Sequence, residues 1–265
     1  MKREPSEDTI QIEPKYKLSL EELNRLTNEL IADKTKSISE GHRLVTVEVG
    51  SDEIYSNVAR HIEQNLAFFK EDDLESEFKP YESASRFFIS VDRREGKATG
   101  VIRVIENSPA GFETPHDLSN PPFNIAEGEW MKQHDITDLD KVWDIASLGV
   151  LPEYQNGFVS LQLFRAVYKS AVEVHDIEHF VALIDKNALG KLENFFGVAF
   201  QPLAGSTGAP YHHSEWTQPV YGHLPDMYLT ANHRMDAPIG KAASRAAEVL
   251  VMGANDGSLV LDTEN

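Results

Sequence analysis

The feature that most limits the possible folds is a strand-like run at residues 141–151 that leads directly into an amphipathic helix. The apolar residues of this helix recur at helical spacing: Leu163, Phe164, Val167 and Ala171. A second apolar run, residues 179–184, follows after a short polar break. A strand, a helix and a strand in immediate succession predict a pair of parallel strands joined by a helix. We therefore expect an α/β protein.

The sequence divides the chain into three predicted segments. Residues 1–43 form an N-terminal extension with one predicted helix, for which Ser19 and Glu22 have the spacing of a capping box. Its apolar residues follow at helical intervals: Leu20, Leu23, Leu26 and Leu30. Residues 44–232 are predicted to form the main domain. Residues 233–265 are predicted to hold a C-terminal helix and a polar tail.

The first half of the main domain predicts a strand, a helix and an antiparallel hairpin. Residues 44–49 are rich in β-branched side chains, and Ser51 is expected to cap the helix that follows. This helix carries apolar residues every four positions: Ile54, Val58, Ile62 and Leu66. Residues 86–91 and 98–105 flank a charged turn in which Gly96 can adopt a left-handed conformation. A long segment without periodicity, residues 106–140, follows and is expected to be an active-site cover or an insertion.

The charge balance and the residue types exclude several classes of function. Acidic residues outnumber basic ones by 43 to 25, and the formal net charge of −18 disfavours nucleic acid as a partner. The absence of cysteine excludes disulfides, thiolate nucleophiles and Cys-based metal sites. No run of about 18 apolar residues occurs, so we expect a cytoplasmic protein with no membrane span. His212, His213 and His223 lack carboxylates at metal-binding spacing, and we predict no metal.

Common catalytic motifs are also missing. The chain contains neither G-x-G-x-x-G nor G-K-[ST], so dinucleotide-binding and P-loop sites have no local support. It contains neither H-E-x-x-H nor G-x-S-x-G, which removes the local signature of zinc proteases and α/β-hydrolases.

The strand-like run at residues 141–151 continues into the phrase L-x-V-x-P-x-Y-Q, formed by Leu148, Val150, Pro152, Tyr154 and Gln155. This phrase, together with the order of the predicted elements, resembles the GCN5-related N-acetyltransferase superfamily. In that superfamily a strand ends in L-x-V-x-P-x-[YF]-[QR] and runs into the cofactor loop. The resemblance extends over residues 44–230 and is strongest over residues 142–200. It implies one α/β domain with a mixed, mostly antiparallel sheet, a parallel strand pair that splays apart, and helices on both faces.

The resemblance also implies a site for an acyl thioester. Backbone groups at the splay would pair with the pantetheine arm, and loop amides before the helix would meet the CoA pyrophosphate. The residues implied for this role are Leu148, Val150, Gln155, Asn156, Gly157, Phe158, Val159, Ser160 and Asn187. Phe158 and Ser160 stand where the family has glycine, and Glu193 stands where many members have a proton-donating tyrosine.

These departures lead to a second, fainter resemblance, to the acyl-homoserine-lactone synthases and the N-acyl amino acid synthases. Those enzymes take acyl groups from CoA or from acyl carrier protein. Their strand phrase E-x-[ST]-R-x-x-V would lie on Asp144, Ala146, Ser147 and Val150, which keeps the acid but loses the Ser/Thr and the Arg. Because the two bulky loop residues weaken contact with phosphate, an acyl group longer than acetyl is favoured.

Two residues are candidates for proton transfer. Asp144 lies on the strand that reaches the splay and is the preferred base; alternatively, it bonds backbone amides or pairs with Lys141. His213 lies in a predicted loop between the last two strands, where a histidine could take a proton from an amine; alternatively, it is simply solvated. Arg165 and Lys169 could contact a 3′-phosphate or a carrier protein, or could form the polar face of a helix.

The function expected from these residues is transfer of an acyl group from a thioester to a primary amine by direct attack. The co-substrate would be acyl-CoA or an acyl-carrier-protein thioester. The partners would be a small-molecule amine and, for one of the two donors, the carrier protein. Leu148 or Val150 would polarise the thioester carbonyl through a backbone N–H. The alternative is a catalytically silent domain of the same fold that binds a ligand or another protein.

Overall fold

The computed structural model describes residues 12–39, 42–66, 73–155, 158–195, 200–212, 214–227 and 259–260. Its strands are β1 Leu44–Gly50, β2 Ser85–Asp92, β3 Lys97–Ile105, β4 Val142–Val150, β5 His179–Asp185, β6 Gln201–Pro202, β7 Ala209–Tyr211, β8 Ser214–His223 and β9 Leu259–Val260. Its helices are α1 Leu20–Lys34, α2 Ser56–Asn65, α3 Leu74–Phe78, α4 Glu113–Leu118, α5 Glu129–Gln133, α6 Phe158–Glu173 and α7 Lys186–Phe195. Short 3-10 turns are η1 Lys79–Ala84, η2 Leu139–Lys141, η3 Pro152–Tyr154 and η4 Leu203–Gly205.

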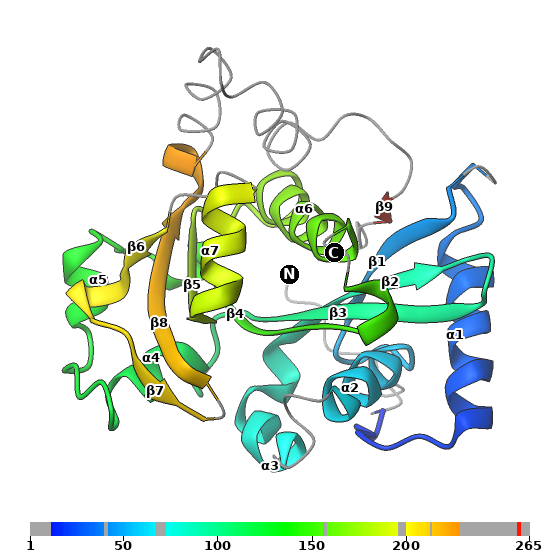
Figure 1. Ribbon diagram of the computed structural model, residues 1–265, viewed down its shortest axis with the longest axis horizontal. Helices are drawn as coiled ribbons and strands as arrows, with labels where there is room; N and C mark the ends of the chain where they lie inside the picture. The colour runs from blue at the N-terminus through cyan, green and yellow to red at the C-terminus, as the bar shows by residue number, and fades with distance from the viewer. Residues whose placement is uncertain are drawn as a thin grey trace, which may run out of the picture.

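All nine described strands belong to one sheet, in the order β6-β8-β5-β4-β3-β2-β1-β9, with β7 paired to β8. Most neighbours are antiparallel, whereas β4 and β5 are parallel, as are β1 and β9. Helices α6 and α7 lie on one side of the sheet and α2 and α3 on the other (Figure 1). The predicted fold class is confirmed: this is an α/β protein with a mixed, mostly antiparallel sheet that contains a parallel pair.

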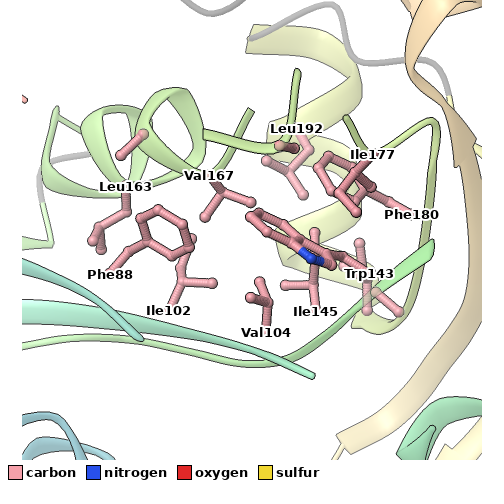
Figure 2. Close-up of a cluster of buried hydrophobic side chains, with 14 of the residues drawn as sticks. Phe88, Ile102, Val104, Trp143, Ile145, Leu163, Val167, Ile177, Phe180 and Leu192 are labelled. Carbon is pink, nitrogen blue, oxygen red and sulfur yellow. The ribbon is translucent and has the colours of Figure 1, made fainter. Parts of the chain in front are cut away.

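The face under α6 is apolar. Trp143 of β4 and Phe180 of β5 stack at a centroid distance of 6.4 Å, and Leu163 and Val167 of α6 pack over the same face of the sheet (Figure 2). These side chains alternate along their strands with others that point to the opposite face, as the strand period of two requires. The stripe predicted for α6 therefore faces the core.

The opposite face is covered by α1 and α2. Ser19 caps α1 as predicted, because its side chain accepts a hydrogen bond from the Glu22 N–H at 3.1 Å. Leu26 and Leu30 are buried, but Leu20 is 73% exposed, so the predicted stripe is wrong at its first position. That residue lies in the first turn of the helix, before the helix reaches the sheet.

Several predicted boundaries need correction. Helix α2 begins at Ser56 after Tyr55, so Ser51 does not cap it; Ser51 lies in the preceding turn. The segment at residues 106–140 contains α4 and α5, which are too short to produce a visible period. The C-terminal helix predicted within residues 233–265 lies outside the described residues.

The hairpin between β2 and β3 forms as predicted. Gly96 has a φ of +62° in the turn, the left-handed conformation that glycine tolerates. The register pairs Asp92 with Lys97 and Ser85 with Ile105. Among the described residues, no helix is both long and apolar enough to cross a bilayer.

Candidate functional site

Strands β4 and β5 run together for only part of their length. Their parallel register pairs Val142 with His179 and ends with Ile145 opposite Ala182. Beyond this point β4 continues beside β3 to Val150, and β5 continues beside β8 to Asp185. The described register gives β4 no strand partner on its β5 side after Ile145, so the backbone groups of residues 146–150 on that side, apart from the Val150 carbonyl that Gln155 bonds, are open to another chain or ligand.

A β-bulge lies at the point where the strands part. Arg103 of β3 pairs with Ser147 and the next residue, Val104, pairs with Ile145, so Ala146 has no opposite residue. A bulge adds one residue to a strand and bends it locally. The extra residue therefore marks the place where β4 leaves β5.

Most of the described residues proposed to contact the thioester gather at the carboxyl end of β4. Leu148 packs partly buried against the α6 core, and the Val150 carbonyl accepts a hydrogen bond from Gln155 Nε2 at 2.9 Å. Phe158 opens α6 and is 53% exposed, whereas Val159 is fully buried and Ser160 half-buried. Asn156 and Gly157 lie outside the described residues.

The Val159 side chain has a structural role, whereas Asn187 takes part through its backbone. The Val159 side chain packs closely over β3, since a Cβ on Gly100 would lie 3.1 Å from Val159 Cγ1. A ligand could therefore contact Val159 mainly through its backbone. Asn187 is exposed at the start of α7, and its backbone N–H donates to Asp185 Oδ1 at 2.8 Å. It follows β5, so it lies at the same edge of the sheet as the carboxyl end of β4.

Asp144 is fully buried on β4, on the face opposite α6. Its Oδ2 accepts a hydrogen bond from the Thr114 N–H at 2.7 Å, while its Oδ1 has no hydrogen-bond partner in the described structure. Burial raises the pKa of Asp144 to about 7, although the Thr114 hydrogen bonds oppose this shift. Lys141 forms its ion pair with Asp176 instead. Of the two structural alternatives, the backbone amide contact exists and the lysine pair does not.

Helix α4 brings two further carboxyl groups to Asp144. Burial and then the charge of Asp144 raise the pKa of Glu113 well above its usual value. Asp117, one turn later, accepts a hydrogen bond from the Tyr211 hydroxyl, and burial raises the pKa of Asp117. The sequence analysis missed both residues; their only signal is the spacing of four between two acids in a segment with no other period.

The histidine loop borders the same region. His213 lies outside the described residues. The His212 ring lies edge-on to Tyr211 at a centroid distance of 4.2 Å, and Tyr211 in turn contacts Asp117.

The two basic residues of α6 do not form an open docking surface. Arg165 is buried, so it is not part of an exposed polar face. Lys169 pairs with Glu173 at 3.8 Å on the same helix.

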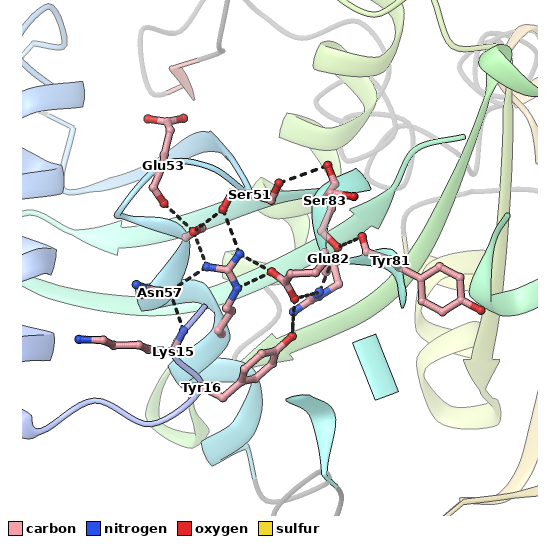
Figure 3. Close-up of polar contacts among 12 residues, drawn as sticks. Lys15, Tyr16, Ser51, Glu53, Asn57, Tyr81, Glu82 and Ser83 are labelled. Atoms are coloured by element: carbon pink, nitrogen blue, oxygen red, sulfur yellow. Dashed lines mark hydrogen bonds and ion pairs between the residues drawn. The ribbon is translucent and has the colours of Figure 1, made fainter. Parts of the chain in front are cut away.

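On the α2 side of the sheet, buried ionic groups fix β3 and β4. Arg103 donates to both oxygens of Glu63 at 3.1 and 2.8 Å, and the Ser147 hydroxyl donates to the same carboxylate. Burial alone would lower the pKa of Arg103, but Glu63 raises it overall. Figure 3 shows Tyr16 and Glu82 extending these contacts; the Tyr16 hydroxyl donates to Glu82 at 2.7 Å. The network holds β4 on the side opposite the apolar core.

A surface cavity of about 590 Å³ lies away from the parting of the strands. Its lining includes Lys141, Glu178 and His179, where β4 and β5 begin. The His134 and Tyr221 rings stack in its wall at a centroid distance of 3.8 Å. Because parallel strands part at their other ends, this cavity is separate from the proposed thioester site. Among the described residues, no group of three His, Cys, Asp or Glu side chains is arranged to hold a metal ion.

No protein-family model matches the chain, and no curated protein matches it. Among solved structures, it is similar to a CoA-dependent acyl-homoserine lactone synthase, BjaI, with SAM and isopentyl-CoA: the TM-score is 0.47 and the identity 14%, over 77% of this chain and 98% of that one. It is similar to FeeM, an N-acyl amino acid synthase from uncultured soil microbes, with a TM-score of 0.47 and 14% identity over 71% and 94% of the two chains. It is also similar to the spermidine/spermine N-acetyltransferase SpeG from Vibrio cholerae, with a TM-score of 0.40 and 11% identity over 68% and 91%. The first two are enzymes of the two kinds named by the fainter sequence resemblance.

Proposed function

We propose that the chain transfers an acyl group from a CoA or acyl-carrier-protein thioester to a primary amine. The observation that carries this proposal is the position of Asp144: a fully buried carboxyl group on β4, two residues before the bulge at which β4 parts from β5. A base with a pKa near neutrality beside an open strand edge suits proton removal from an amine that attacks a thioester held on that edge.

The donor would be held mainly by backbone. The open edge at residues 146–150 would pair with the amide groups of the pantetheine arm, as an added strand pairs with a sheet edge. The N-terminus of α6 would contact phosphate oxygens through its first amides. Leu148, Val150 and the loop and helix residues from Gln155 to Ser160 would form this surface. Asn187 would border it at the end of β5.

The position of the reacting carbonyl follows from the length of the strand. At about 3.3 Å per residue, Ala146 lies about 7 Å along β4 from Asp144, and Leu148 about 13 Å. A carbonyl polarised at Leu148 or Val150 would need water to relay the proton to Asp144. We therefore place the carbonyl beside Ala146, the residue of the open edge that lies nearest to Asp144 along the strand.

The reaction needs no acyl-enzyme. The amine nitrogen bonds to the carbonyl carbon, the carbon–sulfur bond breaks, the amine proton passes to Asp144, and the thiolate takes a proton from solvent. His213, which lies outside the described residues, is the second candidate base. Asp144 at a pKa of about 7 is roughly half ionised at neutral pH, so activity should rise with pH through that value.

Thiol release tests the proposal with little background, because the chain has no cysteine of its own. Purified protein is incubated with acetyl-, hexanoyl- or palmitoyl-CoA and a panel of primary amines, and free thiol is measured with a disulfide dye. We expect amine-dependent release that Asp144→Asn lowers by about 10²-fold or more. The exposed acid Glu127 provides the charge-matched control Glu127→Gln.

Absence of turnover with every donor, including acyl carrier protein, would contradict an enzymatic function. Titration calorimetry then separates the remaining possibilities. Binding of a thioester without turnover would favour a silent ligand-binding domain. Binding of no thioester would favour a protein-interaction module.

A further inference from the structure

Three carboxyl groups from two distant parts of the chain converge under α4. Asp144 comes from β4, and Glu113 and Asp117 come from the first and last turns of α4. We call these three residues the acidic cluster. Glu77 of α3 lies close enough that its charge raises the pKa of Glu113, and it borders the cluster where Asp117 is partly exposed.

The charge of this cluster is poorly compensated. The cationic groups whose charges lower these pKa values are Arg103 for Glu113, and His116 and His212 for Asp117. Burial is the larger effect at each of the three carboxyl groups and raises its pKa. Arg103, moreover, lies on the same face of the sheet and already bonds both oxygens of Glu63 there.

One observation points to a missing partner. Asp144 is fully buried, and its Oδ1 has no hydrogen-bond partner in the described structure. Leaving a buried carboxylate oxygen without a donor is costly, and such groups are normally bonded to protein, water or a ligand. The negative charge of Asp144 raises the pKa of Glu113, and that of Asp117 raises the pKa of Asp144. A partner that is both a hydrogen-bond donor and a cation fits this site.

We infer that the acidic cluster binds an acceptor that carries two cationic amines and no carboxylate. One amine would lie beside Asp144 and react, while the second would contact Glu113 or Asp117. Glu113 and Asp117 lie one turn apart on α4, so either can meet the second nitrogen of a short diamine whose first nitrogen lies beside Asp144. This inference rests on the proposed function, because it identifies the acceptor of the same site.

An acceptor that carries a carboxylate fits poorly. It would add a further negative charge beside three carboxyl groups, and at short range like charges repel strongly in a partly buried site. A small diamine or polyamine brings N–H donors and positive charge to the same place. The Tyr211 hydroxyl, which donates to Asp117, and Tyr81 nearby form the aromatic wall around these groups.

Binding of such an acceptor should be coupled to proton release. In the free protein burial raises the pKa of Glu113 and of Asp144, so each carboxyl group holds its proton more tightly than it would in water. A bound cation favours the ionised carboxylates, so protons leave when the diamine binds. Diamine affinity should therefore increase between pH 6 and pH 8.

Three four-carbon compounds test the inference on the whole chain by titration calorimetry: 1,4-diaminobutane, n-butylamine and 4-aminobutanoate. We expect the diamine to bind at least tenfold more tightly than the monoamine, and 4-aminobutanoate to bind most weakly. Titrations in buffers of different ionisation enthalpy should detect proton release with the diamine. Asp117→Asn and Glu77→Gln should each weaken diamine binding several-fold. Glu75→Gln, an equal charge change at an exposed position of α3, should leave it unchanged.

The outcomes separate this inference from the proposed function. Equal or tighter binding of 4-aminobutanoate, or diamine binding that neither Asp117→Asn nor Glu77→Gln weakens, overturns the acidic cluster as the acceptor site. Thiol release with 4-aminobutanoate but not with the diamine leaves acyl transfer standing and refutes the acceptor class. Tight, proton-linked diamine binding without thiol release from any donor supports the site and refutes acyl transfer.

Discussion

Replacing Asp144 by asparagine tests whether burial controls the ionisation of this group. The pKa of Asp144 is raised from 3.8 to about 7, so the folded protein holds this proton more tightly than the unfolded chain does. Stabilisation from the bound proton is complete below pH 3.8 and decreases as the pH rises, because the unfolded chain ionises first. The decrease ends above pH 7, where Asp144 is ionised in both states.

The size of this effect follows from the shift. Each pKa unit corresponds to about 1.36 kcal/mol, so the full shift of about three units corresponds to roughly 4 kcal/mol. Between pH 5.5 and pH 8.5 only the part from 5.5 to about 7 is still to be lost, or about 2 kcal/mol. Over this interval the wild-type free energy of unfolding should fall about 2 kcal/mol more than that of Asp144→Asn.

Urea unfolding followed by tryptophan fluorescence measures both curves, because Trp130 and Trp143 are buried. An asparagine at position 144 can still accept from the Thr114 N–H, so any constant packing cost shifts its curve without changing the slope. The exposed control Glu127→Gln should run parallel to the wild type. Parallel curves for wild type and Asp144→Asn across this range would refute the raised pKa and the choice of Asp144 as base.

Three further predictions concern packing, the buried ions and the donor. Gly149→Ala should lower the free energy of unfolding by about 1 to 3 kcal/mol, because the new Cβ would lie 1.6 Å from Leu66 Cδ1; chemical denaturation should show partial recovery when Leu66→Ala is added. Arg103→Met should cost about 3 to 5 kcal/mol by leaving Glu63 buried and unpaired, and Glu63→Gln in the same chain should recover part of that cost in a double-mutant cycle. Phe158 is exposed at a position where the resembling family has glycine, which weakens contact with the CoA phosphates, so the enzyme should prefer hexanoyl-CoA to acetyl-CoA. A kcat/KM for hexanoyl-CoA lower than that for acetyl-CoA would contradict this preference.

The parts of the fold that were predictable are those with long apolar runs. Helix α6 buries side chains at helical intervals, and β4 and β5 are almost continuously buried, so the helical period and the two apolar runs were visible in the sequence. The turn at Gly96 was predictable because its conformation depends on local chemistry alone. The start of α2 was not, because a turn occupies residues 51–55 before the helix begins at Ser56.

The candidate site was only partly predictable, because its contacts join distant segments. Asp144 could be identified from its strand, but Thr114 and Glu113 reach it across about 30 residues through a six-residue helix that has no sequence period. The ion pair of Arg103 with Glu63 joins residues 40 apart and depends on which faces of β3 and α2 meet. Such pairings depend on register and packing, which a single sequence does not encode locally.

The short parallel contact between β4 and β5 makes the sheet a structure of two halves. Four register pairs join the half that contains β1 to β4 to the half that contains β5 to β8. Cooperative units that meet across few hydrogen bonds tend to open separately in native-state hydrogen exchange. A ligand that bonds to both β4 and β5 beyond Ile145 would link the two halves of the sheet and stabilise the boundary between them, which we call the seam. At a concentration one hundredfold above its Kd it would add about 2.7 kcal/mol to the cost of opening, and amides along the seam should then exchange about one hundredfold more slowly.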